Sequence, residues 1–352
     1  MALVETLPAP DANTRKLARS LKLKHVAAET LSIRRRRLGE RFSYQTAKGI
    51  TIKDRETLAR LKSLAVPPAY EDVLYAEDPR AHIQAIGRDA AGRLQYRYHP
   101  DWQKVREMRK SARLARLAEA LPRIRRAVGR YLGEAEPSRA LALAAVVDLV
   151  ARSAIRPGSE SYAKLRGTRG AATLLKSNVS VQGDTITLKF RAKGGKNVVK
   201  SFAAPRLCEA LAVLRQVPGR RLFQFRNEAG DVRMVTAREV NVFLREIAET
   251  RISLKDFRTL LASVSVLEAL AKVTPATSKR ARRSQVLEAI RAAAEDLSNT
   301  PAICAKSYVH ETVVAAFEEG VLEEFADALR ATRSPAKREQ VLAEVIATAA
   351  AA

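Results

Sequence analysis

The spacing of apolar residues divides the chain into two parts of different character. From about residue 32 to residue 100, apolar and polar side chains alternate over short runs, which is typical of half-buried β-strands. Residues 82–86 and 93–98 flank an Asp-Ala-Ala-Gly turn and predict a β-hairpin. Asp54 precedes leucines at helical spacing, so it can cap one short helix. The first part therefore predicts a small, mostly antiparallel sheet domain.

After residue 102 the apolar positions recur every three or four residues, as they do in amphipathic helices. One β interruption is expected, in which residues 179–181 and 185–190 form a hairpin and a glycine-rich loop leads to a strand at 197–202. The predicted helices lie at 102–120, 122–134, 138–154, 205–216, 236–249, 256–272 and 279–297, with another starting at Thr300-Pro301. The second part therefore predicts a larger, mainly helical domain containing a β-hairpin sheet, which makes the chain α+β.

The net charge of the chain indicates what class of partner it binds. Lys and Arg number 63 against 38 Asp and Glu, a formal net charge of +25. Such an excess attracts polyanions and favours a nucleic acid over a merely solvated surface. An anionic membrane is the alternative, but no single helix collects the charge opposite a large apolar face. The sequence therefore predicts DNA or RNA as the partner.

Cysteine and histidine usage narrows the chemistry further. Two cysteines and four widely separated histidines predict neither a disulfide framework nor a metal motif. No apolar run approaches the roughly 18–20 residues of a membrane span, and the first residues lack the features of a secretory signal. We expect a reducing, cytoplasmic compartment and no cofactor. A nucleotide-binding P-loop, a magnesium-binding carboxylate cluster and an HExxH motif do not occur in the sequence.

Four short segments carry a family resemblance. They resemble, in order and approximate spacing, the R-x-G-x-x-x-Y, F-x-x-K-x-G, K-D-[FL]-R-T and N-T-P-x-x-x-x-x-Y segments of type IB DNA topoisomerases of the small, poxvirus-like and bacterial kind. The similarity extends from residue 33 to about residue 318 and includes residues 66–73 and 87–98. The four segments are IRPGSESY at 155–162, FRAKGG at 190–195, KDFRT at 255–259 and NTPAICAKSYV at 299–309.

The resemblance implies a role for each matching residue. Tyr308 would attack the scissile phosphate, leaving a 3′-phosphotyrosyl bond and a free 5′-hydroxyl. Arg156 and Arg258 would hold the non-bridging oxygens, for which the planar guanidinium is suited. Lys193 would protonate the departing 5′-oxygen. Asn299 stands where many relatives carry histidine; it can donate a hydrogen bond but cannot shuttle a proton. Supercoils would then relax by swivelling, without ATP.

Other matching residues are expected to touch DNA rather than to react. A polar-aromatic strand can simply be half-buried, but the resemblance implies that Gln95, Tyr96 and Tyr98 read bases in the major groove. Asp256 is expected to cap its helix or to pair with a lysine. After the second arginine, residues 260–263 lack the aromatic and glycine common in bacterial relatives, which bears on local packing. The further expected DNA contacts are Tyr162, Lys196 and Lys255.

Two other functions fit part of the pattern. A tyrosine recombinase shares the nucleophile and arginines, but usually carries histidine where Lys255 stands and begins with a helical domain. A non-enzymatic basic nucleoid protein explains the charge but not the ordered motifs. The resemblance to type IB DNA topoisomerases implies a monomer acting as a clamp around duplex DNA and associated with the nucleoid. Its predicted parts are a flexible leader (1–24), a β-rich DNA-binding domain (25–104), a catalytic domain (105–332) and an alanine-rich tail (333–352).

Overall fold

The structure is a computed structural model that describes residues 12–351, so residues 1–11 of the predicted leader lie outside the described residues. The chain forms two compact units, which meet in sequence between Lys110 and Ser111. That boundary falls inside the long helix α3, Trp102–Tyr131. Each unit has its own apolar core, and the α+β prediction is confirmed.

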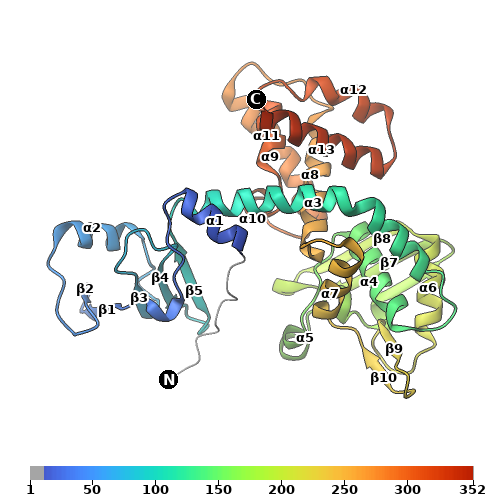
Figure 1. Cartoon of the computed structure of the whole chain (residues 1–352), viewed down its shortest axis with the longest axis horizontal. Coiled ribbons are helices and arrows are strands. Elements are labelled where there is room, and N and C mark those ends of the chain that lie inside the picture. Colours follow the sequence, from blue (N-terminus) through green and yellow to red (C-terminus); the bar gives the residue numbers. More distant parts are fainter. Residues whose placement is uncertain (1–11, 352) are drawn as a thin grey trace. The chain divides into compact units, whose positions relative to one another are not determined.

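The first unit is a five-stranded antiparallel sheet in the order β2-β1-β3-β4-β5 (Figure 1). Helix α2 begins after Asp54, whose carboxylate accepts from the Thr57 amide as predicted, and its Leu61 packs against one face of the sheet. The other face is covered by the segment around Ala28 and Leu31. The elements are α1 Ala12–Ser20, β1 Ile33–Leu38, β2 Arg41–Gln45, α2 Arg55–Ser63, β3 Glu71–Tyr75, β4 Ile83–Arg88 and β5 Leu94–Tyr98.

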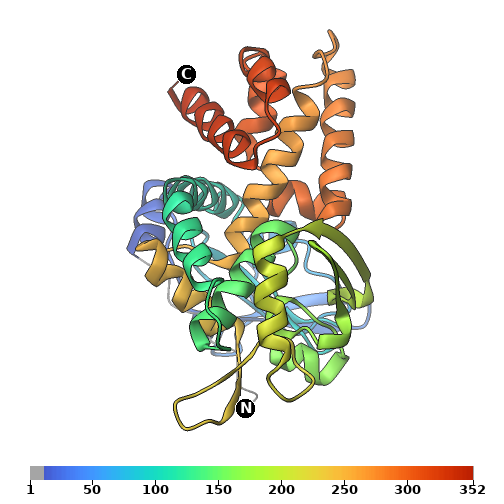
Figure 2. The same ribbon diagram turned by 90° about the vertical axis from the view of Figure 1, so that its right-hand side faces the viewer.

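The second unit combines a three-stranded sheet with a large set of helices. The sheet has the order β6-β7-β8, and α4 and α6 pack beside it (Figure 2). Helix α4 is buried along most of its length and forms the centre of the core. The elements are α4 Arg139–Ser153, α5 Glu160–Arg166, β6 Val179–Gln182, β7 Thr185–Arg191, β8 Asn197–Ala203, α6 Pro205–Arg215, β9 Gln224–Arg226, β10 Val232–Met234, α7 Ala237–Ala248, α8 Leu254–Leu270, α9 Lys279–Asp296, α10 Pro301–Ser307, α11 Glu311–Glu318, α12 Glu323–Ala331 and α13 Pro335–Ala351.

Two expectations about local structure are corrected. Residues 102–120 and 122–134 are not separate helices, because α3 continues through Pro122. The proline removes one backbone hydrogen bond, yet Leu121 and Ile124 on either side of it are buried in the same core, which keeps the helix continuous. Strand β3 was not predicted. Its alternation is broken by Asp72, which has φ of 51° beside a register shift in the pairing with β4.

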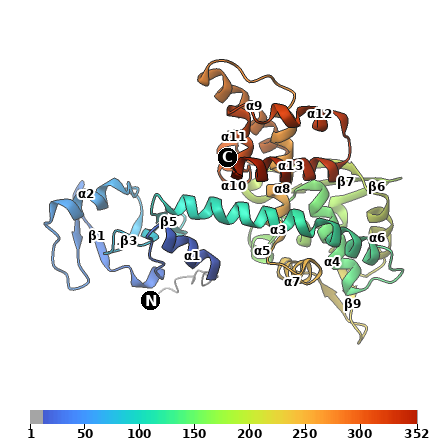
Figure 3. The same ribbon diagram turned by 45° about the horizontal axis from the view of Figure 1, so that its top comes forward.

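Helices form at both ends of the described chain. In the leader region, α1 buries Ala18, and Leu23 follows it into a cluster with Trp102. The alanine-rich tail forms α13, which buries Val341 and Leu342 and packs against α8 and α11 (Figure 3). In both segments, small and aliphatic residues at helical spacing pack against a core. Burial of their apolar surface offsets the loss of conformational entropy when the segments become ordered.

Candidate active site

The first turn of α8 holds one arginine of the predicted site. Asp256 accepts hydrogen bonds from the Ser253 amide at 2.7 Å and from the Ser253 hydroxyl at 2.9 Å. These contacts form a capping box at the start of α8. The capping role predicted for Asp256 is therefore confirmed. The cap fixes the helix start from which Lys255 and Arg258 project.

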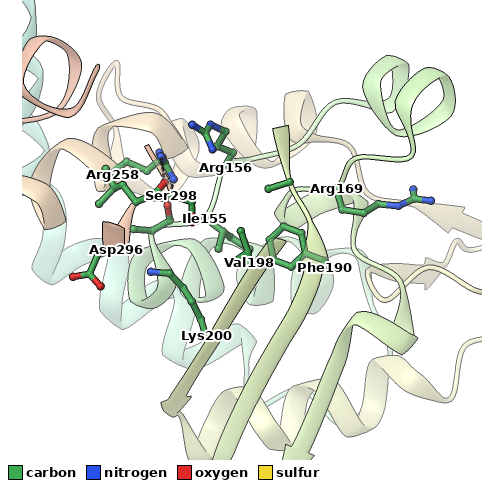
Figure 4. Close-up of a pocket in the computed structure, with 12 residues that line it drawn as sticks. Ile155, Arg156, Arg169, Phe190, Val198, Lys200, Arg258, Asp296 and Ser298 are labelled. Atoms are coloured by element: carbon green, nitrogen blue, oxygen red, sulfur yellow. Dashed lines mark hydrogen bonds between the residues drawn. The ribbon is translucent and has the colours of Figure 1, made fainter. Parts of the chain in front are cut away.

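Arg258 is a buried cation held by backbone carbonyls. Only 1% of its surface is exposed. Its Nη1 donates to the carbonyl of Ala154, and its Nη2 donates to that of Leu297 at 3.0 Å. Ala154 and Leu297 are the C-caps of α4 and α9, so the guanidinium faces the negative ends of two helix dipoles (Figure 4). Among the described residues, no carboxylate forms an ion pair with Arg258, which leaves its charge available to an anion.

Tyr308 lies against this guanidinium. It is the C-cap of α10 and is 8% exposed. The guanidinium carbon of Arg258 lies 4.8 Å from the centroid of the tyrosine ring, and the Lys255 ammonium lies 5.6 Å from it. Burial raises the pKa of the phenol, but Arg258, by its charge and hydrogen bond, and then Lys255 and Arg156 outweigh burial and lower the pKa below its usual value. The phenol is therefore easier to ionise than an ordinary tyrosine.

Arg156 and Asn299 form a second contact in the same region. The Nη2 of Arg156 donates to the Oδ1 of Asn299. Asn299 is 9% exposed, and its Nδ2 has no hydrogen-bond partner among the described residues. An unpaired buried donor is costly unless a ligand accepts from it. The pair therefore presents N–H groups from two segments that are distant in sequence.

The loop that carries Arg156 depends on two glycines. Gly158 has φ of 95°, which favours glycine. A Cβ on Gly170 would lie 2.5 Å from the Arg156 carbonyl oxygen and 2.5 Å from the Gly158 nitrogen. The Arg156 carbonyl accepts from the Ala171 amide at 2.8 Å in this close approach. The glycine of the first motif therefore shapes the arginine's loop.

Lys200 on β8 lies in the cavity beside these arginines, as Figure 4 shows. Ile155, Phe190 and Val198 supply part of its apolar wall. Burial lowers the pKa of Lys200, and Arg258 lowers it further, although Asp296 acts in the opposite direction. The sequence favours Lys200, like Lys196, as a phosphate contact rather than an acid, although Lys200 lies outside the four motifs.

The structure does not join Lys193 to this group. Lys193 is exposed in the 3-10 turn Lys193–Gly195 between β7 and β8. Its ammonium lies 5.7 Å from the centroid of the Tyr162 ring, and Tyr162 is 43% exposed. Among the described residues no contact of Lys193 with Arg156, Arg258 or Tyr308 is found. Lys196 is also exposed at this tip, where its carbonyl accepts from the Ala192 amide at 2.7 Å.

The predicted base-reading residues lie on β5, at the edge of the first unit's sheet. Tyr96 and Tyr98 stack at 6.0 Å and pack against an apolar cluster on one face. Alternation along the strand directs Gln95 to the opposite face, where its Nε2 donates to Asp89 at 2.9 Å. Tyr98 also lies under the Arg106 guanidinium at 4.5 Å. The three residues therefore do not share one face of the strand.

Between residues 12 and 351, no three or more His, Cys, Asp and Glu side chains cluster in a way that could hold a metal ion. Within the same range, no helix has the length and apolar character needed to cross a membrane.

Comparisons with known proteins place the chain in a family. Residues 99–334 match the model of the catalytic core of eukaryotic DNA topoisomerase I. Residues 41–89 match the model of the N-terminal domain of bacterial DNA topoisomerase IB. These matches define an isomerase of the DNA-topoisomerase class.

A particular relative narrows the class. The chain is 30% identical over 288 residues to the DNA topoisomerase 1B of Acanthamoeba polyphaga mimivirus. The aligned region covers 79% of this chain and 84% of the relative. The chain belongs to the type IB DNA topoisomerase family. The resemblance inferred from the four motifs is thereby confirmed, and the match of residues 41–89 supports the bacterial form.

Proposed function

We propose that this chain relaxes supercoiled duplex DNA by cutting one strand with Tyr308, allowing the free end to rotate, and rejoining the strand without ATP or metal. The observation that carries the proposal is the contact between Tyr308 and Arg258. A buried phenol lies 4.8 Å from a guanidinium that no carboxylate among the described residues neutralises. This arrangement suits a nucleophile that must meet a phosphate.

The cleavage step exchanges one phosphoester for another. The Tyr308 oxygen forms a bond to phosphorus, and the bond from phosphorus to the 5′-oxygen breaks. The phenolic proton passes to solvent, and the departing 5′-oxygen gains a proton. Arg156, Arg258 and Asn299 donate to the non-bridging oxygens, where negative charge builds up in the five-coordinate transition state. Because the phosphotyrosyl bond retains the phosphodiester energy, the reverse reaction rejoins the strand.

Lys193 is the proposed general acid for the 5′-oxygen. An alkoxide is a poor leaving group, so its departure requires a proton. Gly194 and Gly195 beside the lysine have φ of 80° and 77°, a conformation that glycine adopts at little cost. The lysine contacts Tyr162 in the DNA-free chain. Delivery of its proton therefore requires the hairpin tip to move onto bound DNA.

The two parts of the chain are proposed to divide the work. Residues 25–104 bind and read DNA, with Gln95, Tyr96 and Tyr98 near the cleavage site, and residues 105–332 carry out cleavage. A monomer encloses the duplex, and the protein is associated with the nucleoid. The net charge of +25 supports this assignment, because basic surfaces release counterions from DNA when they bind.

Replacement of the nucleophile tests the proposal. Tyr308→Phe removes one hydroxyl, so the variant should fold and bind DNA but form no covalent adduct. Plasmid relaxation is measured in EDTA without ATP, and adducts on DNA labelled at the 5′ end of the cleaved strand are trapped with detergent. Tyr131→Phe is the matched control, since the ring contacts of Tyr131 are with Phe243 and Arg130 and not with Arg156, Arg258 or Tyr308. An adduct that survives in Tyr308→Phe would place the nucleophile elsewhere.

A further inference from the structure

A buried serine links the arginine helix to the segment that ends with the predicted nucleophile. Ser263 lies on α8 five residues after Arg258 and is fully buried. Its hydroxyl donates to the carbonyl of Tyr308 at 3.3 Å and accepts from the amide of His310 at 3.0 Å. One side chain therefore satisfies two backbone groups across more than forty residues of chain.

Local hydrogen bonds also hold the segment that Ser263 contacts. Tyr308 follows α10, which has seven residues, and the amides of Tyr308 and Val309 both donate to the carbonyl of Cys304 at 2.9 and 3.1 Å. His310 then begins α11, and its Nδ1 accepts from the Thr312 amide at 3.2 Å. These bonds fix the segment to its neighbours in sequence, whereas the Ser263 bonds fix it to α8.

Helix α8 therefore has two connections to the reaction centre. An α-helix is stiff over five residues, which span about 7.5 Å along its axis. Arg258 at one end of this span contacts the Tyr308 ring, and Ser263 at the other end contacts the Tyr308 backbone. A shift of α10 against α8 would separate the phenol from the guanidinium unless the backbone were held in register.

We propose that Ser263 is a positioning residue, which holds the Tyr308 backbone in register with Arg258 so that the phenol and the phosphate-binding guanidinium meet in one geometry. This inference rests on the proposed function of Tyr308 as the nucleophile. A displacement of about 1 Å in a reacting group can slow a reaction on the order of 100-fold. Loss of the serine hydroxyl should therefore slow strand cleavage by about 10- to 100-fold.

Two variants remove the bridge in different ways. Ser263→Ala deletes the hydroxyl, and Ser263→Cys keeps the approximate size but replaces the hydroxyl with a weak donor and acceptor. If the alanine variant does not fold, the cysteine variant is used to test the positioning role of Ser263. Ser153→Ala is the matched control, because Ser153 is also buried in a helix of the same unit but donates to the Leu149 carbonyl of its own helix at 2.5 Å.

Three quantities are measured on the full chain: the single-turnover cleavage rate, the Kd for an uncleaved duplex, and the pH dependence of cleavage. We expect slower cleavage, an unchanged Kd, and a pH midpoint displaced upwards. The last effect follows because a phenol that moves away from Arg258 loses a cation that lowers the pKa of Tyr308. A role in general stability would slow cleavage without moving that midpoint.

The outcomes separate this inference from the proposed function. Cleavage by both Ser263 variants at the rate of Ser153→Ala, or slower cleavage with an unmoved pH midpoint, overturns the positioning role while Tyr308 remains the nucleophile. An adduct formed by Tyr308→Phe overturns the proposed function itself. Slower cleavage with a displaced midpoint, alongside an inactive Tyr308→Phe, supports both.

Discussion

Arg258→Lys separates the charge of the buried cation from its geometry. The Arg258 guanidinium donates to the carbonyls of Ala154 and Leu297 and also lies over the ring of Tyr308. A lysine ammonium retains the charge but lacks the planar fork that serves partners in several directions at once. At least one of the two buried carbonyls is then left without its donor, at a cost of about 1–3 kcal/mol in the free energy of unfolding.

The effect on catalysis should be larger than the effect on stability. Loss of one aligned donor to a developing oxyanion costs about 10²- to 10³-fold in rate, so Arg258→Lys should cleave at least about 100-fold more slowly than the parent chain. Because the charge stays, the pH midpoint of cleavage should move less than in Arg258→Ala, where the largest of the cations that lower the pKa of Tyr308 is gone.

The assay combines urea unfolding, followed by circular dichroism, with single-turnover cleavage of an oligonucleotide that cannot be rejoined. The alanine variant is the comparison, since it loses charge and geometry together. Cleavage by Arg258→Lys within about threefold of the parent rate would refute the reasoning, because it would mean that charge alone suffices and the fork is dispensable. Equal pH midpoints for the lysine and alanine variants would refute the electrostatic part.

Two further predictions concern the hairpin tip and the first unit. Lys193→Ala should cleave ordinary DNA slowly but regain its rate on a substrate with sulfur at the bridging 5′ position, because a thiolate leaves without an acid. If sulfur does not restore the rate, Lys193 is a phosphate contact and not the general acid. His82 is buried in contact with His25 and near Arg106, which lowers its pKa from 6.5 to about 3. The unfolded chain therefore takes up a proton as pH falls below 6.5 while the folded chain does not, which should remove about 2 kcal/mol of unfolding free energy between pH 7 and pH 5. Urea unfolding measures this loss when it is followed by the fluorescence of Trp102, the single tryptophan, whose ring centroid lies 4.4 Å from that of His82. An equal loss of unfolding free energy in His82→Phe would contradict the assignment to His82.

The sequence was most informative where a residue type is required at a fixed spacing. The motif residues Arg156 and Asn299 are in contact in the structure, as are Arg258 and Tyr308. Their chemical roles remain proposals, but their proximity could be anticipated from the motifs. Lys193 was expected with them and lies apart. Sequence order alone does not fix the position of an exposed hairpin tip before DNA binds.

Other features could not be predicted because they depend on tertiary contacts. Ser263 lies in a stretch that was read only as a departure from relatives in local packing, and a single polar residue in an apolar helix has no periodic signature. Pro122 was taken as a helix break, since local propensity disfavours proline, but burial on both sides overrides it. For Lys200 the sequence favours a phosphate contact, but its place in the cavity beside Arg156 and Arg258 depends on the packing of β8 beside α4.

The backbone cradle around Arg258 has a consequence for how such a site evolves. Its two acceptors are peptide carbonyls at the ends of α4 and α9, so they are present whatever side chains occupy those positions. Ala154 has φ of 54°, and mutation there is constrained by backbone shape rather than by chemistry. The carbonyl acceptor at Leu297 can therefore be kept while the residue type there changes, whereas the left-handed backbone at Ala154 restricts which residues can stand there. The contact at Leu297 would therefore leave no trace in a comparison of residue identities among distant relatives.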